Sequence, residues 1–309
     1  MTNTTILLQQ VVNGLSLGAI YALLALGFTM VYGILELINF AHFAVFLVGA
    51  MVGLLALQAF GLSGQAIIMH GFALVAVLLV ALIVTMFVCG VLGVGIERFL
   101  LRPLRGVKGP MGMITTIGIS YVLINIVLLL TNAQALNYPD PLPPMTATFS
   151  GVTITGKTIL IWGIAIMLMV SLHYFVSRTR LGKAMRAVAQ DAEAARMMGI
   201  DVDRMVMTAF FIGSALAGAA GLIFGLYYNF VDYNIGYTAG LRAFTAAVLG
   251  GIGNVPGAMF GGLIIGLVET IGSQYIAAQW ADVLIFSILI GTLVFKPAGL
   301  LGVLAPNRS

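Results

Sequence analysis

Long apolar segments recur along almost the whole chain, and each approaches or exceeds the length needed to cross a lipid bilayer. They run over residues 6–33, 40–60, 67–96, 112–130, 159–175, 205–228, 241–276 and 283–295. A transmembrane helix needs about 20 mostly apolar residues. Charged residues make up 8% of the 309 residues, against about 25% in soluble domains. The sequence therefore excludes a soluble or disordered protein, and it predicts an all-α, polytopic membrane protein with about eight transmembrane segments.

We expect residues 1–309 to form a single transmembrane domain, because no segment is long and polar enough to fold by itself in water. The longest polar stretch is the loop over residues 177–204. The first ten residues contain no Lys or Arg, unlike the basic leader of a signal peptide. The first apolar segment is therefore expected to stay in the mature chain.

Basic residues predict the orientation of the chain. Apart from Lys157 and Arg242, all Lys and Arg residues lie in the loops after the third and fifth segments or in the C-terminal tail. Lys108 belongs to the first of these loops and Arg308 to the tail. Cytoplasmic loops carry an excess of Lys and Arg. We therefore place these loops and the C-terminus in the cytoplasm, and the N-terminus and the loop 131–158 outside. The net charge of +4 is explained by this placement, so no nucleic-acid partner is expected.

The segment 241–276 must begin and end outside if this orientation holds. It is too long for one ordinary span and short for two. The sequence GGIGNVPGAMFGG interrupts it with Pro256 and several glycines, which disfavour a continuous helix. We predict a broken hairpin made of a half-helix, a turn and a full helix. Non-helical backbone at membrane depth needs protein or water around it, and interrupted helices often mark the binding site of a transporter.

Small residues recur at four-residue spacing in three of the segments, which allows two helices to approach closely. Close contact within one subunit explains this pattern, and so does an interface between subunits. The residues are Gly14, Gly18, Gly213, Ala217, Gly221, Gly225, Gly257 and Gly261.

The stretch GVTITGKT over residues 151–158 matches the phosphate-binding loop pattern. That pattern binds phosphate between a strand and a helix of a soluble α/β domain, whereas this stretch runs directly into a membrane span. We interpret it as a chance match. Lys157 is expected to anchor the chain at the membrane interface, and the chain is not expected to bind ATP by itself.

The polar loop 177–204 contains a helix-forming middle with a small apolar surface, and Gly182 and Gly199 are predicted to end that helix on either side. A solvated loop that fixes topology is one interpretation. A short cytoplasmic helix that docks into a groove of another protein is the other.

Three separate motifs resemble bacterial branched-chain amino acid ABC-transporter permeases, and the resemblance covers nearly the whole chain. They are GAIYALLALGFTMVYG with the following LELINFAHF, then SRTRLGKAMRAVAQDAEAARMMGI, and AFTAAVLGGIGNVPGAMFGG. The chain is most similar to the shorter, H-type permease subunit. Phe43 departs from the pattern, because many relatives have Gly after the Asn-Phe-Ala-His run.

The resemblance implies a permease domain that imports branched-chain amino acids across the bacterial cytoplasmic membrane. Such a domain is surrounded by the membrane lipids. It implies as partners a second homologous permease, two ATPase subunits that bind the ATP, and a periplasmic solute-binding protein. No cofactor is expected on this chain. The loop corresponds to the coupling helix that contacts the ATPases, and the implied coupling residues are Gly182, Lys183, Arg186, Asp191, Ala194 and Gly199.

Polar residues at membrane depth and the glycines of the broken hairpin are candidates for the translocation pathway, because buried polar groups in membranes are costly and usually functional. An ion pair between Arg242 and Glu269 that holds the hairpin is an equally supported interpretation, and His42 is also explained by a hydrogen bond between helices. The candidates are Asn39, His42, Arg242, Gly250, Gly251, Gly253, Gly257 and Glu269.

Other functions stay open at this stage. Relatives in the same family could import urea, amides or small aromatic acids. An ion-coupled secondary transporter would use a carboxylate at mid-membrane, and Glu269 is the strongest candidate for it. Neither a nucleophile with its base nor a metal-binding spacing of histidines occurs, and Cys89 is the single cysteine. We therefore expect neither catalysis nor a metal site.

Overall fold

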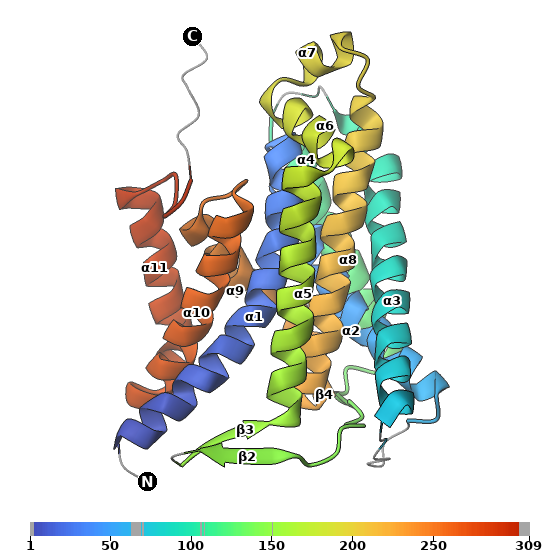
Figure 1. The fold of residues 1–309 in the computed structure, drawn as a ribbon. Coiled ribbons are helices and arrows are strands. Elements are labelled where there is room, and N and C mark those ends of the chain that lie inside the picture. The colour runs from blue at the N-terminus through green and yellow to red at the C-terminus, as the bar shows by residue number, and fades with distance from the viewer. Residues whose placement is uncertain are drawn as a thin grey trace.

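The computed structural model describes residues 3–62, 69, 71–105, 107, 109–149 and 151–302. His70, Lys108 and Arg308 lie outside these residues. Within the described part, eight helices are long and apolar enough to cross a membrane. They pack into a single bundle, in which α1 runs at a slant to the upright α5 and α8 (Figure 1). The prediction of an all-α, polytopic membrane protein is confirmed.

The helices are α1 (Asn3–Leu35), α2 (Ala41–Ala59), α3 (Gly71–Gly95), α4 (Met111–Leu130), α5 (Gly156–Arg178), α6 (Arg180–Gln190), α7 (Ala192–Met197), α8 (Val202–Tyr228), α9 (Ile235–Gly250), α10 (Val255–Tyr275) and α11 (Ala281–Phe295). Shorter helical turns are η1 (Ile96–Leu101), η2 (Arg102–Leu104) and η3 (Ala278–Trp280). The strands are β1 (Leu136–Asn137), β2 (Thr146–Phe149), β3 (Val152–Thr155) and β4 (Phe230–Val231).

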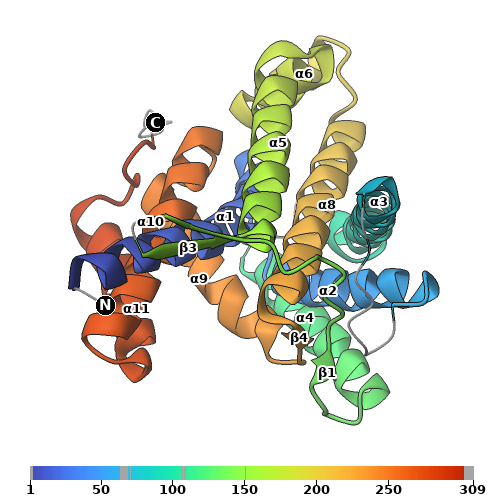
Figure 2. The same cartoon turned by 60° about the horizontal axis from the view of Figure 1, so that its bottom comes forward.

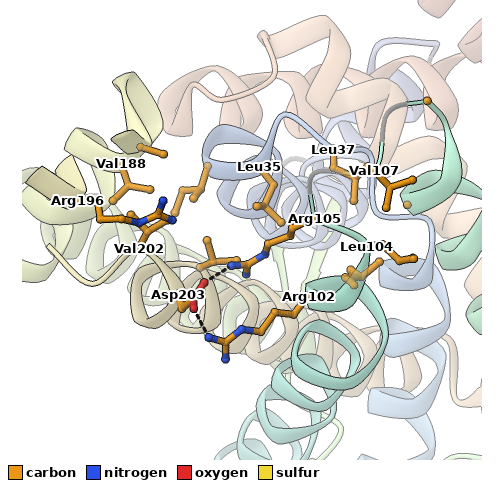
Figure 3. Close-up of a pocket in the computed structure, with 16 residues that line it drawn as sticks. Leu35, Leu37, Arg102, Leu104, Arg105, Val107, Val188, Arg196, Val202 and Asp203 are labelled. Atoms are coloured by element: carbon orange, nitrogen blue, oxygen red, sulfur yellow. Dashed lines mark hydrogen bonds and ion pairs between the residues drawn. The ribbon is translucent and has the colours of Figure 1, made fainter. Parts of the chain in front are cut away.

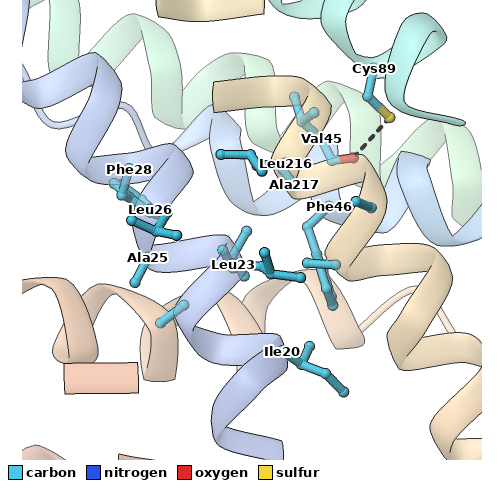
Figure 4. Close-up of a cluster of buried hydrophobic side chains, with 14 of the residues drawn as sticks. Ile20, Leu23, Ala25, Leu26, Phe28, Val45, Phe46, Cys89, Leu216 and Ala217 are labelled. Carbon is cyan, nitrogen blue, oxygen red and sulfur yellow. Dashed lines mark hydrogen bonds between the residues drawn. The ribbon is translucent and has the colours of Figure 1, made fainter. Parts of the chain in front are cut away.

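Helices α1 and α8 form the centre of the bundle. Helix α1 packs against α8, α9 and α10, and α8 packs also against α2 and α3. Ile20, Leu23 and Phe46 are among the fully buried side chains between them (Figure 4). Cys89 is buried on α3, and its thiol donates a hydrogen bond to the carbonyl of Val45 over 3.7 Å. By contrast α3, α4, α5 and α11 expose most of their apolar side chains, as expected of helices in contact with lipid.

The two ends of the bundle differ. Helices α6 and α7 lie at one end, which we call the inner end because the sequence predicts it to be cytoplasmic (Figure 1). The N-terminus of α1 and the β2–β3 hairpin lie at the opposite, outer end (Figure 1), and β3 passes in front of α1 when that end is turned toward the viewer (Figure 2). Strands β1 and β4 pair antiparallel, which ties the loop 131–158 to the connection between α8 and α9. Tyr138 lies buried beside β1, and this burial raises the pKa of its phenol well above the ordinary value.

The broken hairpin is present as a half-helix, a turn and a full helix. Helix α9 begins at Ile235 rather than near Leu241, so Arg242 lies inside the half-helix instead of at its start. The hydroxyl of Tyr275 at the end of α10 donates to the carbonyl of Asn3 at the start of α1. The hairpin therefore begins and ends at the outer end, as its topology required.

The turn of this hairpin, residues 251–254, lies at the inner end of the bundle. The backbone N–H groups of Leu300 and Leu301 donate to the carbonyls of Leu249 and Gly250 over 2.7 and 3.0 Å. The C-terminal segment therefore covers the turn. The half-helix has 16 residues and spans about 24 Å, so the non-helical backbone that follows it lies near the inner end of the bundle.

The small-residue faces pack within the chain. A Cβ atom at Gly221 would meet the backbone of α2, and one at Gly18 would meet the backbone of Leu263 on α10. Gly257 and Gly261 face the backbone of α9 in the same way. Of the two interpretations of this pattern, close contact within the subunit is the one the fold shows.

Candidate functional site

A polar cavity opens in the outer half of the bundle between α1, α8 and α10. Its volume is about 270 Å³, and we call it the outer cavity. Glu269 is the charged member among its described lining residues. The lining residues are Gln10, Asn13, Leu17, Tyr227, Tyr228, Glu269, Thr270, Ser273 and Gln274.

A second cavity, of about 430 Å³, lies under the β2–β3 hairpin and shares Asn13 and Tyr227 with the outer cavity. It also contains Asp140 and Lys157. The two cavities together form a polar route from the outer surface to Glu269. Amide and hydroxyl groups dominate this route, so it offers many weak hydrogen bonds and little fixed charge.

Glu269 lies at the end of this route in a network of charged groups. Its Oε1 atom lies 2.5 Å from Nη1 of Arg242, and its Oε2 accepts a hydrogen bond of 2.8 Å from the hydroxyl of Tyr21. The Nη2 atom of Arg242 lies 2.9 Å from Oδ1 of Asp282. The network therefore joins α1, α9, α10 and α11, and the expected ion pair between Arg242 and Glu269 is confirmed.

Two cavities open at the inner end between the end of α5, helix α6 and the start of α10, and we call them the inner cavities. Their volumes are about 70 and 430 Å³, and both contain Val176, Arg186, Gly253 and Val255. The smaller one also contains Thr29, Met30 and Gly33 of α1. The turn of the broken hairpin therefore forms part of the wall.

Helix α1 separates the outer from the inner cavities. Leu17 lines the outer cavity and Thr29 lines the smaller inner one. The side chains from Ile20 to Leu26 between them are fully buried. Twelve helical residues span about 18 Å. The bundle is therefore closed by packed side chains in its middle third and hollowed at both ends along α1 and α10.

The structure divides the predicted pathway residues into three groups. Glu269 and Gly253 line cavities, and Arg242 contacts Glu269. Gly250, Gly251 and Gly257 form close backbone contacts, Gly250 with Gly257 across the hairpin and Gly251 with the C-terminal segment. These glycines keep the hairpin arms together and line none of these cavities.

Asn39 and His42 form the third group, and both are buried away from these cavities. The side-chain oxygen of Asn39 accepts a hydrogen bond from the backbone N–H of Ala41 at the start of α2. Nε2 of His42 lies 3.2 Å from the carbonyl oxygen of Leu24, and its ring packs edge-on against Phe28. The expected hydrogen bond between helices explains His42 in this structure.

The loop 177–204, which the resemblance implies to be the coupling loop, folds into two short helices rather than one. Asp191 ends α6 and caps α7, because its side chain accepts hydrogen bonds from the N–H groups of Glu193 and Ala194. Gly182 lies in the first turn of α6 and ends no helix, so that prediction was wrong. Gly199 follows α7 with φ of +81°, as expected of a residue that ends a helix.

Coupling candidates differ in what they contact. The guanidinium of Arg186 donates to the carbonyl of Val176, which holds α6 against the end of α5. Lys183 lies on α6, and Ala194 is half-buried on α7. Met197 and Met198 at the end of α7 are 79% and 82% exposed. Met198 belongs to the small apolar surface that the sequence predicts for this loop, whereas Met197 was not predicted to be part of it.

Lys157 has a structural role at the outer end. Its Nζ atom lies 2.7 Å from Oδ2 of Asp140 and 2.7 Å from Oδ1 of Asn229. Residues 152–155 form β3, and α5 begins directly at Gly156. The strand therefore leads into the helix without the loop that phosphate binding requires. Lys157 holds the outer loop against the end of α8.

The roles of Tyr21, Asp282 and the two tyrosines of the outer cavity were not predicted from the sequence. Tyr21 lies inside an apolar run, and a tyrosine there signals a hydrogen-bond partner because its hydroxyl needs one when it is buried. Asp282 directly precedes the last apolar segment, where an acidic residue also fits a helix start. Tyr227 and Tyr228 end a span, where tyrosines are common at membrane interfaces.

Comparisons with known proteins agree with this architecture. The family model "Branched-chain amino acid transport system / permease component" matches residues 10–293. The chain is 40% identical over 299 residues to the high-affinity branched-chain amino acid transport system permease protein BraD of Pseudomonas aeruginosa, covering 96% of this chain and 95% of that protein. It is 40% identical over 300 residues to the corresponding protein LivH of Escherichia coli K12, with the same coverage of both chains. No solved structure matches.

Proposed function

The chain belongs to the family of branched-chain amino acid transport permeases, and on this premise we propose how it moves its substrate. It is a multi-pass protein of the bacterial inner membrane and a permease subunit of an ABC importer. The proposed substrates are branched-chain amino acids. The proposed path runs along the shared face of α1 and α10, from the outer cavity to the inner cavities.

The arrangement of the cavities carries this proposal. Both ends of the path are hollow, and the fully buried stretch of α1 closes the middle. An importer must expose its path to one side at a time. A small sliding of α10 against α1 would open one end while it closes the other, because both ends use the same two helices.

The chemistry of the outer cavity fits a permease that receives its substrate from another protein. Amides, hydroxyls and aromatic rings line it, with Glu269 as the charge. Both oxygens of that carboxylate already have partners in Tyr21 and Arg242. The cavity therefore binds an amino acid weakly, and selection falls to a periplasmic solute-binding protein.

Partners supply the energy in this proposal. A second homologous permease completes the membrane part, and two ATPase subunits bind ATP at the inner end. The exposed methionines of α7 supply an apolar docking surface, because methionine side chains adapt readily to a partner. This chain itself takes no cofactor and performs no catalysis.

Transport by purified components tests the function. The chain, its homologous partner and the two ATPases are reconstituted in proteoliposomes with the binding protein, and uptake of leucine, isoleucine, valine, urea and an aromatic acid is compared. We expect uptake of branched-chain amino acids that requires ATP and survives collapse of ion gradients. Uptake driven by an ion gradient without ATP would instead establish an ion-coupled transporter, and preference for urea or an aromatic acid would overturn the substrate assignment.

A further inference from the structure

The largest of the described cavities lies at the inner end, apart from the proposed path. Its volume is about 580 Å³, and we call it the arginine cavity. Its walls are the end of α1, the turns η1 and η2, the start of α4, helices α6 and α7, and the start of α8 (Figure 3). It shares Ile34 with the smaller inner cavity, and the two cavities have no other described lining residue in common.

Guanidinium groups dominate the polar part of this cavity. Arg102, Arg105 and Arg196 line it, and Asp203 is the acidic residue among the described lining residues. Asp203 lies between the first two arginines, with Nη1 of Arg105 at 2.5 Å from its Oδ1. Glu97 is fully buried, does not line the cavity, and forms an ion pair with Arg105. Among the described residues, three positive charges lie near two negative ones, which leaves an excess of one positive charge.

Two guanidinium groups still have unused donors. The buried Nε of Arg105 has no hydrogen-bond partner in the described part of the chain. Arg196 extends from α7 toward Val202 and Asp203 (Figure 3), and no described acidic side chain pairs with it. Buried donors without partners are costly, and the Nε of Arg105 is such a donor. Arg196 is exposed, so its guanidinium is accessible to an anion with several oxygen atoms.

The rest of the wall is aliphatic and continues toward the lipid-facing surface. Leu35, Leu37 and Val188 line the cavity, and Val107 lines it while being 51% exposed. Met111 and Ile114 in the first turns of α4 follow directly and are also exposed. A ligand with its anionic group at the arginines can therefore lay a hydrocarbon chain along this surface.

We propose that the arginine cavity binds the headgroup of an anionic phospholipid of the inner leaflet. Phosphate oxygens accept hydrogen bonds from Arg105 and Arg196, because planar guanidinium groups match phosphate geometry. The glycerol and the upper acyl chain lie along Leu37, Val107 and the start of α4. Basic pockets between helices on the cytoplasmic side are suited to such headgroups. The bound lipid connects the loop after α3 to α7, which belongs to the coupling loop.

Native mass spectrometry of the purified full-length chain tests this site. The protein is titrated with phosphatidylglycerol and, separately, with phosphatidylethanolamine, which carries no net charge. Arg196→Gln removes one charge from the cavity. Arg204→Gln is the matched control, because Arg204 lies at the start of α8 on the same end, is 73% exposed and lines none of the described cavities. Ala192→Trp fills the cavity without changing its charge.

We expect Arg196→Gln to lower the affinity for phosphatidylglycerol about fivefold, and Ala192→Trp to abolish the preference for this lipid. Arg204→Gln should leave the preference unchanged, and phosphatidylethanolamine should bind all variants alike. Equal binding of phosphatidylglycerol by the wild type and both cavity variants would overturn the proposal. Loss of the lipid when the ATPase subunits assemble would also overturn it, because the cavity would then be a docking site for protein.

Discussion

The Nη1 atom of Arg242 lies 2.5 Å from Oε1 of Glu269, and this ion pair joins the two arms of the broken hairpin. At the inner end the turn between the same arms is covered by the C-terminal segment. The hairpin is therefore held at two levels, by charge in its outer half and by backbone hydrogen bonds at its turn. Tyr21 connects the charged level to α1, the helix that separates the outer and inner cavities.

Arg242→Gln should destabilise the protein by about 3 kcal/mol, because it leaves the buried carboxylate of Glu269 without its counter-ion. Glu269→Gln should cost less, since Arg242 keeps Asp282 and the new amide oxygen still accepts from Tyr21. Unfolding of the purified protein in detergent, followed by circular dichroism against denaturant, measures both changes. The double variant should recover part of the loss.

Asp282→Asn is the control for this prediction. The side chain of Asp282 is 61% exposed, so its pair with Arg242 should contribute at most about 1 kcal/mol. Equal losses for Arg242→Gln and Asp282→Asn would show that the buried pair does not hold the hairpin.

Gly266→Ala should force α1 and α10 apart and destabilise the protein. A Cβ at this position would meet the backbone of Gly18 and the carbonyl of Gly14, and backbone atoms have no other rotamer to adopt. Overpacking of this kind costs about 1–3 kcal/mol or more. The yield of monodisperse protein and its melting temperature report the loss.

Gly291→Ala is the matched control, because it also replaces a helical glycine and a Cβ there meets nothing within 4 Å. Alanine is the better helix former, so this variant should be as stable as the wild type or more so. A normal melting temperature for Gly266→Ala would contradict the close approach of α1 and α10.

Periodicity and length predicted most of the fold, because membrane spans need nothing beyond an apolar run of sufficient length. The break in the hairpin followed from Pro256 and its neighbouring glycines, and the pair of Arg242 with Glu269 followed from the cost of a lone charge in the membrane. These features depend on local sequence. The fold confirms each of them.

Features that depend on distant contacts were not predicted. The depth of the hairpin turn is set by the C-terminal segment that binds it, and no local pattern reveals that contact. One local feature was also missed, because the side chain of Asp191 caps α7 and thereby competes with a continuous helix. Tyr21 and Asp282 join the charged network through contacts with helices far away in sequence.

Met198→Glu should uncouple ATP hydrolysis from uptake. Met198 is 82% exposed at the end of α7, so a charge there leaves the fold intact but disrupts an apolar contact with a partner. ATP-driven uptake in proteoliposomes should fall about tenfold, which corresponds to a loss of about 1.4 kcal/mol at the interface. Melting of the isolated chain should stay unchanged.

Met198→Leu controls for the loss of the thioether, because it keeps an apolar side chain of similar size. It should retain most of the uptake. If Met198→Glu transports and assembles as well as the wild type, then the end of α7 makes no contact that matters for coupling.

Cysteine accessibility at the two ends of the proposed path tests the central claim most directly. Ser273→Cys reports on the outer cavity and Val255→Cys on the inner cavities. Thr148→Cys on the exposed strand β2 at the outer end is the control for labelling from outside, and the wild type is a blank because Cys89 is buried. The reconstituted complex is labelled with a membrane-impermeant thiol reagent from each side, in the resting and in the ATP-trapped state. We predict that labelling at the two path positions changes in opposite directions between the states while the control stays constant; labelling that is the same in both states at both positions would contradict a path along α1 and α10.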